Sequence, residues 1–240
     1  PQAVTTWPAY RALFAGSAAA TARGEVSPMY LYHPNAAARI RRHCPNVKLM
    51  ALLRHPADRL FSRWQHLVAD GRAPSDDITD AFDRNSIWWR RDDLVREGFY
   101  GRHLQRYAAR FPREQMRVVL FEEFVADPDG VMQSLFRFLG VDPSVDVDTG
   151  TRHNTSARVA SPLLRWALGR DSALKRWIAA HLPSHWTPAA RAVLTDLRRR
   201  FGRRDTLAPA VRRRLIRDIY RPDILRLEGL LDRDLSHWLA

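Results

Sequence analysis

An arginine and a serine eight residues apart could together bind a phosphate group. Arg54 directly follows the apolar run of residues 47–53, and Ser62 comes eight residues later. A guanidinium can donate two parallel hydrogen bonds to phosphate oxygens, and a serine hydroxyl can donate another. The spacing alone leaves a second interpretation open, in which Arg54 is an ion-pair partner of Asp58 and Ser62 is a neutral helix residue.

Two predicted elements would place these side chains at the edge of a sheet. Residues 47–53 are apolar except for one lysine, which predicts a strand buried on both faces. Pro56 suits the first position of a helix and Asp58 its first turn, and apolar residues recur at helical spacing over residues 60–68. Ligands of open α/β sheets bind beyond the carboxyl ends of the strands, where helix N-termini favour anions. The pattern therefore predicts an anion site.

The rest of the chain alternates between helix and strand. A second strand is predicted over residues 116–121. Helices are predicted over residues 34–43, 100–111 and 131–139, the last ending at Gly140. Residues 71–85 and 142–161 are predicted loops, and the remainder is predicted to be helical, with helices starting near Thr187, 208 and 224. This order favours a layered α/β domain.

Composition narrows the classes of protein. The net charge of +13 indicates an anionic partner, such as a nucleic acid, an acidic membrane surface, or a phosphorylated or sulfated small molecule. The single cysteine, Cys44, excludes an internal disulfide framework and a cysteine-based zinc site, and favours a reducing, cytoplasmic compartment. No run of eighteen apolar residues predicts a transmembrane segment, and no signal peptide is visible at Pro1.

A family resemblance adds to these observations. Residues 48–66, KLMALLRHPADRLFSRWQH, resemble the 3'-phosphate-binding signature of sulfotransferases that use 3'-phosphoadenylyl sulfate (PAPS), above all the bacterial branch related to the heparan sulfate sulfotransferases. Further segments resemble the family in the same order along the chain: residues 24–31, 98–112, 120–128, 138–141, 153–154 and 233–239.

The resemblance implies roles for individual residues. Arg54 and Ser62 would hold the 3'-phosphate of PAPS, and Arg152, His153 and Asn154 would lie near the nucleotide, unless they form an ordinary surface loop. Glu25 and Tyr30 match a segment beside the acceptor cleft. The alternative for these two is structural: Glu25 would pair with an arginine, and Tyr30 would pack in the core.

One departure from the family stands out. The family begins with a strand and a turn rich in Gly, Ser and Thr that carries Lys or Arg, whose backbone N–H groups hold the 5'-phosphosulfate. Residues 1–240 contain no such turn. We therefore expect a single sulfotransferase-like domain, 1–240, that lacks the N-terminal strand and 5'-phosphosulfate loop. No catalytic base can be assigned from the sequence.

The sequence thus predicts an α/β fold, a three-layer P-loop-NTPase-like parallel sheet flanked by helices, with a helical C-terminal part. The predicted activity is transfer of a sulfuryl group from PAPS, without a metal, to a hydroxyl or amine of a carbohydrate, lipid or small metabolite. Nucleic acid is not an expected partner, and oligomeric state is not predicted. The alternatives are a non-catalytic or truncated nucleotide-binding relative and a basic nucleic-acid-binding protein. A P-loop NTPase would need a Walker loop, which the sequence does not contain.

Overall fold

The computed structural model describes residues 4, 6–149, 158–159, 202–203 and 206–240. The chain divides into two compact units, Pro1–Leu52 with Phe111–Thr149, and Leu53–Arg110 with Gly150–Ala240. A single functional domain over residues 1–240 stays a prediction.

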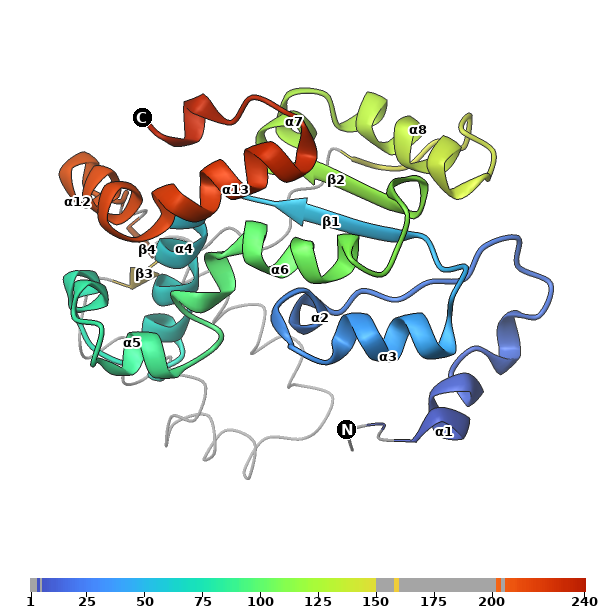
Figure 1. Ribbon diagram of the computed structural model, residues 1–240, viewed down its shortest axis with the longest axis horizontal. Helices are drawn as coiled ribbons and strands as arrows, with labels where there is room; N and C mark the ends of the chain where they lie inside the picture. Colours follow the sequence, from blue (N-terminus) through green and yellow to red (C-terminus); the bar gives the residue numbers. More distant parts are fainter. Residues whose placement is uncertain (1–3, 5, 150–157, 160–201, 204–205) are drawn as a thin grey trace, which may run out of the picture. The chain divides into compact units, whose positions relative to one another are not determined.

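The first unit is built around a small sheet. Strands β1 (Leu49–Leu53) and β2 (Met116–Leu120) pair and run in the same direction (Figure 1). The remaining elements of this unit are helical: α1 (Trp7–Ala12), η1 (Ala15–Ser17), α2 (Pro28–Tyr32), α3 (Ala36–His43), η4 (Arg113–Gln115), α7 (Phe121–Ala126) and α8 (Pro128–Leu139).

Strand β1 is less buried than the sequence predicted. Met50 is 51% exposed and Leu52 is 55% exposed, whereas Leu53 is fully buried. Successive side chains of a strand point to opposite faces, so only one face of β1 is covered. The prediction of a strand buried on both faces is therefore wrong.

Helix α8 ends where it was predicted to end, but it begins at Pro128, three residues before the predicted start at 131. Asp127 Oδ1 accepts a hydrogen bond from the Gly130 N–H at 2.9 Å, and Pro128 occupies the first turn. Gly140 ends the helix in the left-handed region, with φ of 78°, where a side chain would be strained. This confirms the predicted C-terminal cap.

The second unit is mainly helical. The longest of its described helices, α4 (Pro56–Ala69), begins three residues after β1, and helices α6 (Tyr100–Ala108) and α13 (Arg221–Leu231) pack against each other. The shorter elements are η2 (Ile78–Phe82), α5 (Ile87–Arg90), η3 (Arg96–Gly98), α12 (Pro209–Leu215), the π-helical turn η6 (Ile216–Tyr220), η7 (Ser236–Trp238) and an antiparallel pair of β3 (Arg158–Val159) and β4 (Gly202–Arg203).

The core of this unit is formed by large side chains from α4, α6, α12, η6, α13 and the C-terminal segment. The largest fully buried side chains include Trp88, Trp238, Tyr220, Leu60, Leu67 and Leu94. Among the residues that the structure describes, no helix has the length and apolar character needed to cross a membrane.

Candidate functional site

Arg54 and Ser62 lie on the connection and the helix that follow β1. Arg54 is exposed and comes directly after the buried Leu53, and Ser62 is half-buried in the second turn of α4. The first intrahelical hydrogen bond runs from the Arg59 N–H to the His55 carbonyl at 2.9 Å. The amides before Arg59 have no partner within the helix. The predicted strand end and helix N-terminus are thus present in the structure.

Asp58 forms an ion pair with Arg212, not with Arg54. Within the described part of the chain, its carboxylate pairs with Arg212 Nε at 3.2 Å and lies 3.7 Å from His55 Nδ1. Arg212 also donates to the Ala240 carbonyl at 2.9 Å. Asp58 therefore ties the start of α4 to α12 and the C-terminus, and an Arg54–Asp58 ion pair is not formed.

The C-terminal segment also holds the turn between β1 and α4. His55 Nε2 lies 3.1 Å from the Trp238 carbonyl oxygen, and the two rings meet edge-on with centroids 5.9 Å apart. Both residues are buried. Residues 233–239, one of the segments that resembled the family, thus help to shape the connection after β1.

A partly buried ion pair lies one turn into α4. Arg59 Nη1 donates to Glu97 Oε2 at 2.7 Å, and Arg59 Nη2 donates to the Leu94 carbonyl. Burial would lower the pKa of Arg59, but Tyr100 and Glu97 outweigh it and raise that pKa. Burial raises the pKa of Glu97, and the attraction of Arg59 opposes this rise. The charged arginine fixes α4 against η3.

Two tyrosines flank this ion pair. The Tyr220 hydroxyl donates to the Val95 carbonyl at 3.1 Å, and burial is the main cause that raises the Tyr220 pKa to about 12. Burial also raises the pKa of Tyr100, and the positive charge of Arg59 opposes this rise. Both buried phenols thus lie near the Arg59 guanidinium.

Glu25 and Tyr30 are brought together in the first unit. Glu25 is exposed, and its carboxylate lies near the phenols of Tyr30 and Tyr10. Burial and this carboxylate raise the pKa of Tyr10 to about 12 and also raise that of Tyr30. Tyr30 is 38% exposed, so the alternative that it packs in the core is wrong. Within the described residues, the Glu25 carboxylate thus has two phenols as neighbours.

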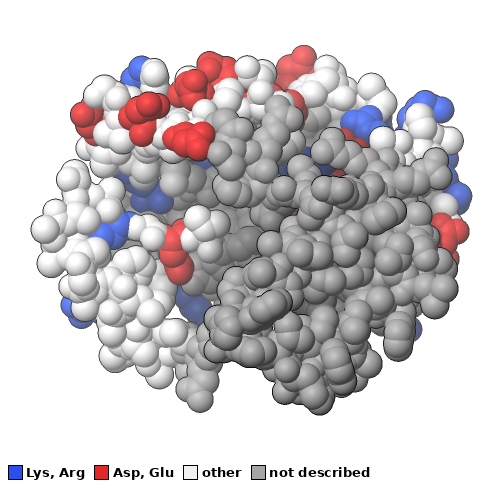
Figure 2. Space-filling view, turned by 180° about the vertical axis from the view of Figure 1, so that it is seen from behind, with Lys and Arg blue, Asp and Glu red and all other residues white. Residues whose placement is uncertain are grey.

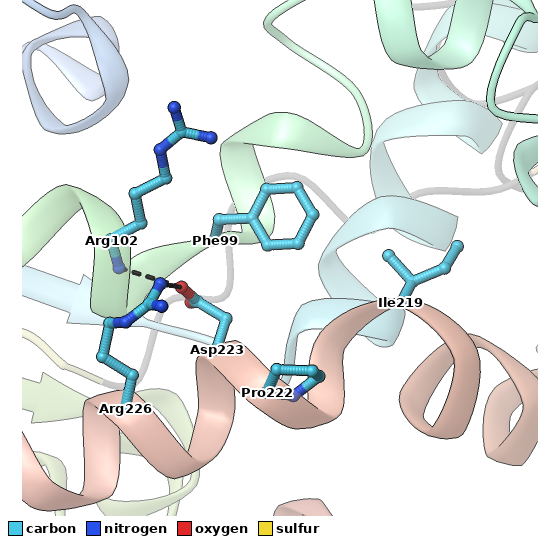
Figure 3. A pocket seen from close by; sticks show the side chains of 6 residues that line it. All are labelled: Phe99, Arg102, Ile219, Pro222, Asp223 and Arg226. Carbon is cyan, nitrogen blue, oxygen red and sulfur yellow. Dashed lines mark hydrogen bonds and ion pairs between the residues drawn. The ribbon is translucent and has the colours of Figure 1, made fainter.

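The second unit contains a shallow pocket, which is lined by residues of α6, η6 and α13 and their neighbours. Figure 3 shows Phe99, Ile219 and Pro222 around it, with the carboxylate of Asp223 pointing toward the start of α6. Asp223 accepts hydrogen bonds from the backbone N–H groups of Gly101 at 2.8 Å and Arg102 at 2.9 Å. Of the predicted nucleotide and acceptor residues that the structure describes, none lines this pocket.

The remaining predicted nucleotide contacts cannot be placed. Arg152, His153 and Asn154 lie outside the described residues. The sequence also missed Tyr10, which lies near Glu25 in the structure. No signal in the sequence predicted the short helix that carries Tyr10.

Comparison with known proteins identifies the family. The profile of the sulfotransferase family matches residues 7–145, more than half of the 240 residues. The chain is 30% identical over 106 residues to human bifunctional heparan sulfate N-deacetylase/N-sulfotransferase 2, covering 41% of this chain and 12% of that protein. It is 26% identical over 127 residues to human heparan sulfate glucosamine 3-O-sulfotransferase 5, covering 50% of this chain and 36% of that protein. The chain thus spans well under half of these relatives.

A solved structure extends the likeness to almost the whole chain. The crystal structure of a sulfotransferase from Alicyclobacillus acidocaldarius superposes with a TM-score of 0.70 at 27% identity, over 99% of this chain and 75% of that one. This confirms the predicted α/β, P-loop-like fold with a parallel sheet flanked by helices. By its family profile and its fold, the chain belongs to the sulfotransferase family.

Proposed function

We propose that this protein takes part in transfer of a sulfuryl group from PAPS to a hydroxyl or amine of an acceptor. The observation that carries the proposal is the match to the sulfotransferase family across residues 7–145, which includes β1, Arg54 and α4. PAPS would supply an activated sulfuryl group, and the protein would supply binding and orientation. No metal is needed for this role.

The residues after β1 fit the 3'-phosphate of such a nucleotide. Arg54 carries an exposed guanidinium at the strand end, and the N-terminus of α4 adds a partial positive charge beside it. The half-buried hydroxyl of Ser62 lies further along the same helix and can donate one hydrogen bond. In this proposal, Arg54 makes the main charge-assisted contact and Ser62 a supporting one. Arg152, His153 and Asn154 stay proposed nucleotide contacts.

The acceptor side is assigned to Glu25 and Tyr30. The exposed carboxylate of Glu25, beside two phenols, can accept a hydrogen bond from an acceptor hydroxyl or amine. The names of the relatives refer to heparan sulfate and its glucosamine, which favours a glycan among the acceptor classes. The net charge of +13 suits an anionic acceptor.

The test compares two nucleotides that differ by one phosphate. Calorimetry should show that the protein binds adenosine 3',5'-bisphosphate more tightly than adenosine 5'-monophosphate. Arg54→Ala should remove this preference, with a loss of about 1.5–3 kcal/mol for the bisphosphate because a charge-assisted contact is lost. Affinity for the monophosphate should not change.

Arg102→Ala is the matched control. Arg102 is also an exposed arginine of the second unit, near the N-terminus of α6, and it lies outside the proposed site. It should retain the preference for the bisphosphate. Equal loss of both nucleotides in Arg54→Ala would refute the 3'-phosphate assignment.

A further inference from the structure

Asp58 places a negative charge in the first turn of α4. His55 precedes this helix as its N-cap residue, and Asp58 lies in the turn whose amides have no partner within the helix. A carboxylate there stabilises the helix because these amides carry partial positive charge. The same carboxylate repels any other anion that binds at this helix end. The proposed 3'-phosphate and Asp58 therefore compete for one end of α4.

Arg212 supplies a positive charge that offsets Asp58. Its Nε lies 3.2 Å from Asp58 Oδ1, and the two side chains are 29% and 32% exposed. Helix α12, which carries Arg212, contacts α4 (Figure 1). His55 Nδ1 is further from the carboxylate, 3.7 Å from Oδ2, and is charged only when protonated. Among the described residues, Arg212 is thus the permanent cation paired with Asp58.

The two phosphates of adenosine 3',5'-bisphosphate would respond differently to this ion pair. In the proposed function, the 3'-phosphate lies beside Arg54 and the N-terminus of α4, and the 5'-phosphate is not assigned to this helix end. Electrostatic interactions weaken with distance, and salt at 0.1 M screens them over about 10 Å. Without its arginine, Asp58 would therefore weaken binding of the 3'-phosphate in particular.

We propose that Arg212 determines specificity for the 3'-phosphate, because it neutralises Asp58 and so keeps the N-terminus of α4 able to bind a second anion. This inference rests on the proposed function, in which Arg54 and the start of α4 bind that phosphate. Arg212 acts through Asp58, so it is a positioning residue and not a catalytic one. Arg212 also donates to the Ala240 carbonyl at 2.9 Å, and the experiment must separate the effect of its charge from this structural contact.

The experiment measures binding of adenosine 3',5'-bisphosphate and adenosine 5'-monophosphate by calorimetry, below the melting temperature of each variant. Arg212→Ala should weaken the bisphosphate roughly three- to tenfold, the effect of one uncompensated charge near a partly solvated ligand, and leave the monophosphate unchanged. Adding Asp58→Asn to Arg212→Ala should restore the bisphosphate to within about twofold of wild type, because the repelling charge is gone. A purely structural role predicts no such restoration, since the second substitution returns no lost contact.

Arg214→Ala is the matched control. Arg214 lies in the same helix and pairs with Asp218 at 3.3 Å, but Asp218 also pairs with Arg217 at 2.7 Å. Arg214→Ala thus removes one positive charge while its carboxylate partner stays paired, and it should keep the wild-type ratio of the two affinities. Arg212→Lys keeps the positive charge and should retain the preference for the bisphosphate, even if the protein melts at a lower temperature.

The outcomes distinguish this inference from the function on which it rests. Four results would overturn the role of Arg212 alone: an unchanged ratio in Arg212→Ala, equal loss of both nucleotides, no restoration by Asp58→Asn, or a loss in Arg212→Lys as large as in Arg212→Ala. A wild-type protein without preference for the bisphosphate would overturn the proposed function and this inference with it.

Discussion

His103 is a buried histidine whose ring nitrogens both have fixed partners. Its Nε2 lies 2.7 Å from the Arg96 carbonyl oxygen, and Arg106 Nη2 lies 3.0 Å from its Nδ1. This arrangement suits a neutral ring in which Nε2 donates and Nδ1 accepts. Burial is the main cause that lowers the pKa of His103 to about 4, from an ordinary value of 6.5. Protonation would set the Nδ1 proton against the Arg106 guanidinium.

Because the folded-state pKa of His103 lies below its unfolded value, the neutral ring contributes stability above pH 6.5 that is lost as the pH falls toward about 4. Urea unfolding should show a loss of about 2–3 kcal/mol from this group between about pH 7.5 and pH 4.5. His103→Gln should flatten that part of the pH dependence. His66→Gln, at a site where the side chain is 63% exposed, should not. An identical pH profile for His103→Gln and wild type would contradict this assignment.

For single residues, the sequence was enough to predict which ones follow a strand end, but it did not predict which distant residues contact them. Arg54 could be found because an apolar run and Pro56 bracket it within a few residues. Trp238, whose carbonyl contacts the neighbouring His55, lies 183 residues after that histidine and carries no local signal of the contact. The Glu25 cluster is similar, since Tyr10 reaches it from a helix that the sequence did not predict. Side-chain partners far apart in the chain are set by packing, which spacing does not encode.

The contact between α6 and α13 depends on a glycine. A Cβ at Gly101 would lie 2.6 Å from the Asp223 carbonyl oxygen and 2.9 Å from the Leu227 nitrogen, both backbone atoms of α13. The Gly101 N–H also donates to the Asp223 carboxylate at 2.8 Å, so the first turn of α6 is capped by the other helix. Close approach of the two backbones therefore requires glycine here.

Gly101→Ala should destabilise the protein by about 1–3 kcal/mol, because an added methyl group must force the two helices apart. Gly229 offers the matched control: it lies in α13, and nothing would lie within 4 Å of its Cβ. Gly229→Ala should stabilise the protein by about 0.5–1 kcal/mol through helix propensity. Denaturant unfolding of both variants measures the difference. Equal effects of the two substitutions would show that the α6–α13 contact tolerates a side chain.

Local end signals helped only where they were used. Helix α8 ends at Gly140 as predicted, whereas its start at Pro128, capped by Asp127, was predicted three residues too late. Helix α7 was missed, and its first residue, Phe121, was assigned to the preceding strand. At its start, the Glu123 carboxylate accepts a hydrogen bond from the Leu120 N–H at 2.9 Å. Leu120 has no side-chain oxygen that could accept a hydrogen bond from the helix in return. The sequence therefore contains the glutamate of a capping box but not its serine or threonine.

Over the whole molecule, charge is unevenly distributed along the chain. The net charge is +13, yet residues 121–148 contain seven carboxylates and one arginine. On the face shown in Figure 2, acidic side chains gather along the upper edge while Lys and Arg are scattered. A protein that binds nucleic acid by charge alone needs a continuous basic surface to contact successive phosphates. An acidic edge of this kind does not suit contact with successive phosphates of a nucleic acid.

Salt dependence distinguishes these two modes of binding. Displacement of counterions from a duplex makes affinity fall by about 10³–10⁵ between 50 and 200 mM salt when six to ten phosphates are contacted. A single 3'-phosphate held by Arg54 and a helix N-terminus involves few charges, so screening should weaken adenosine 3',5'-bisphosphate by only about tenfold or less over the same range. The expected result at 200 mM salt is retained preference for the bisphosphate and no measurable binding of a duplex by fluorescence anisotropy. Duplex binding that persists at this salt, together with lost nucleotide preference, would mean that the positive charge serves a nucleic acid and not the phosphate of a sulfuryl donor.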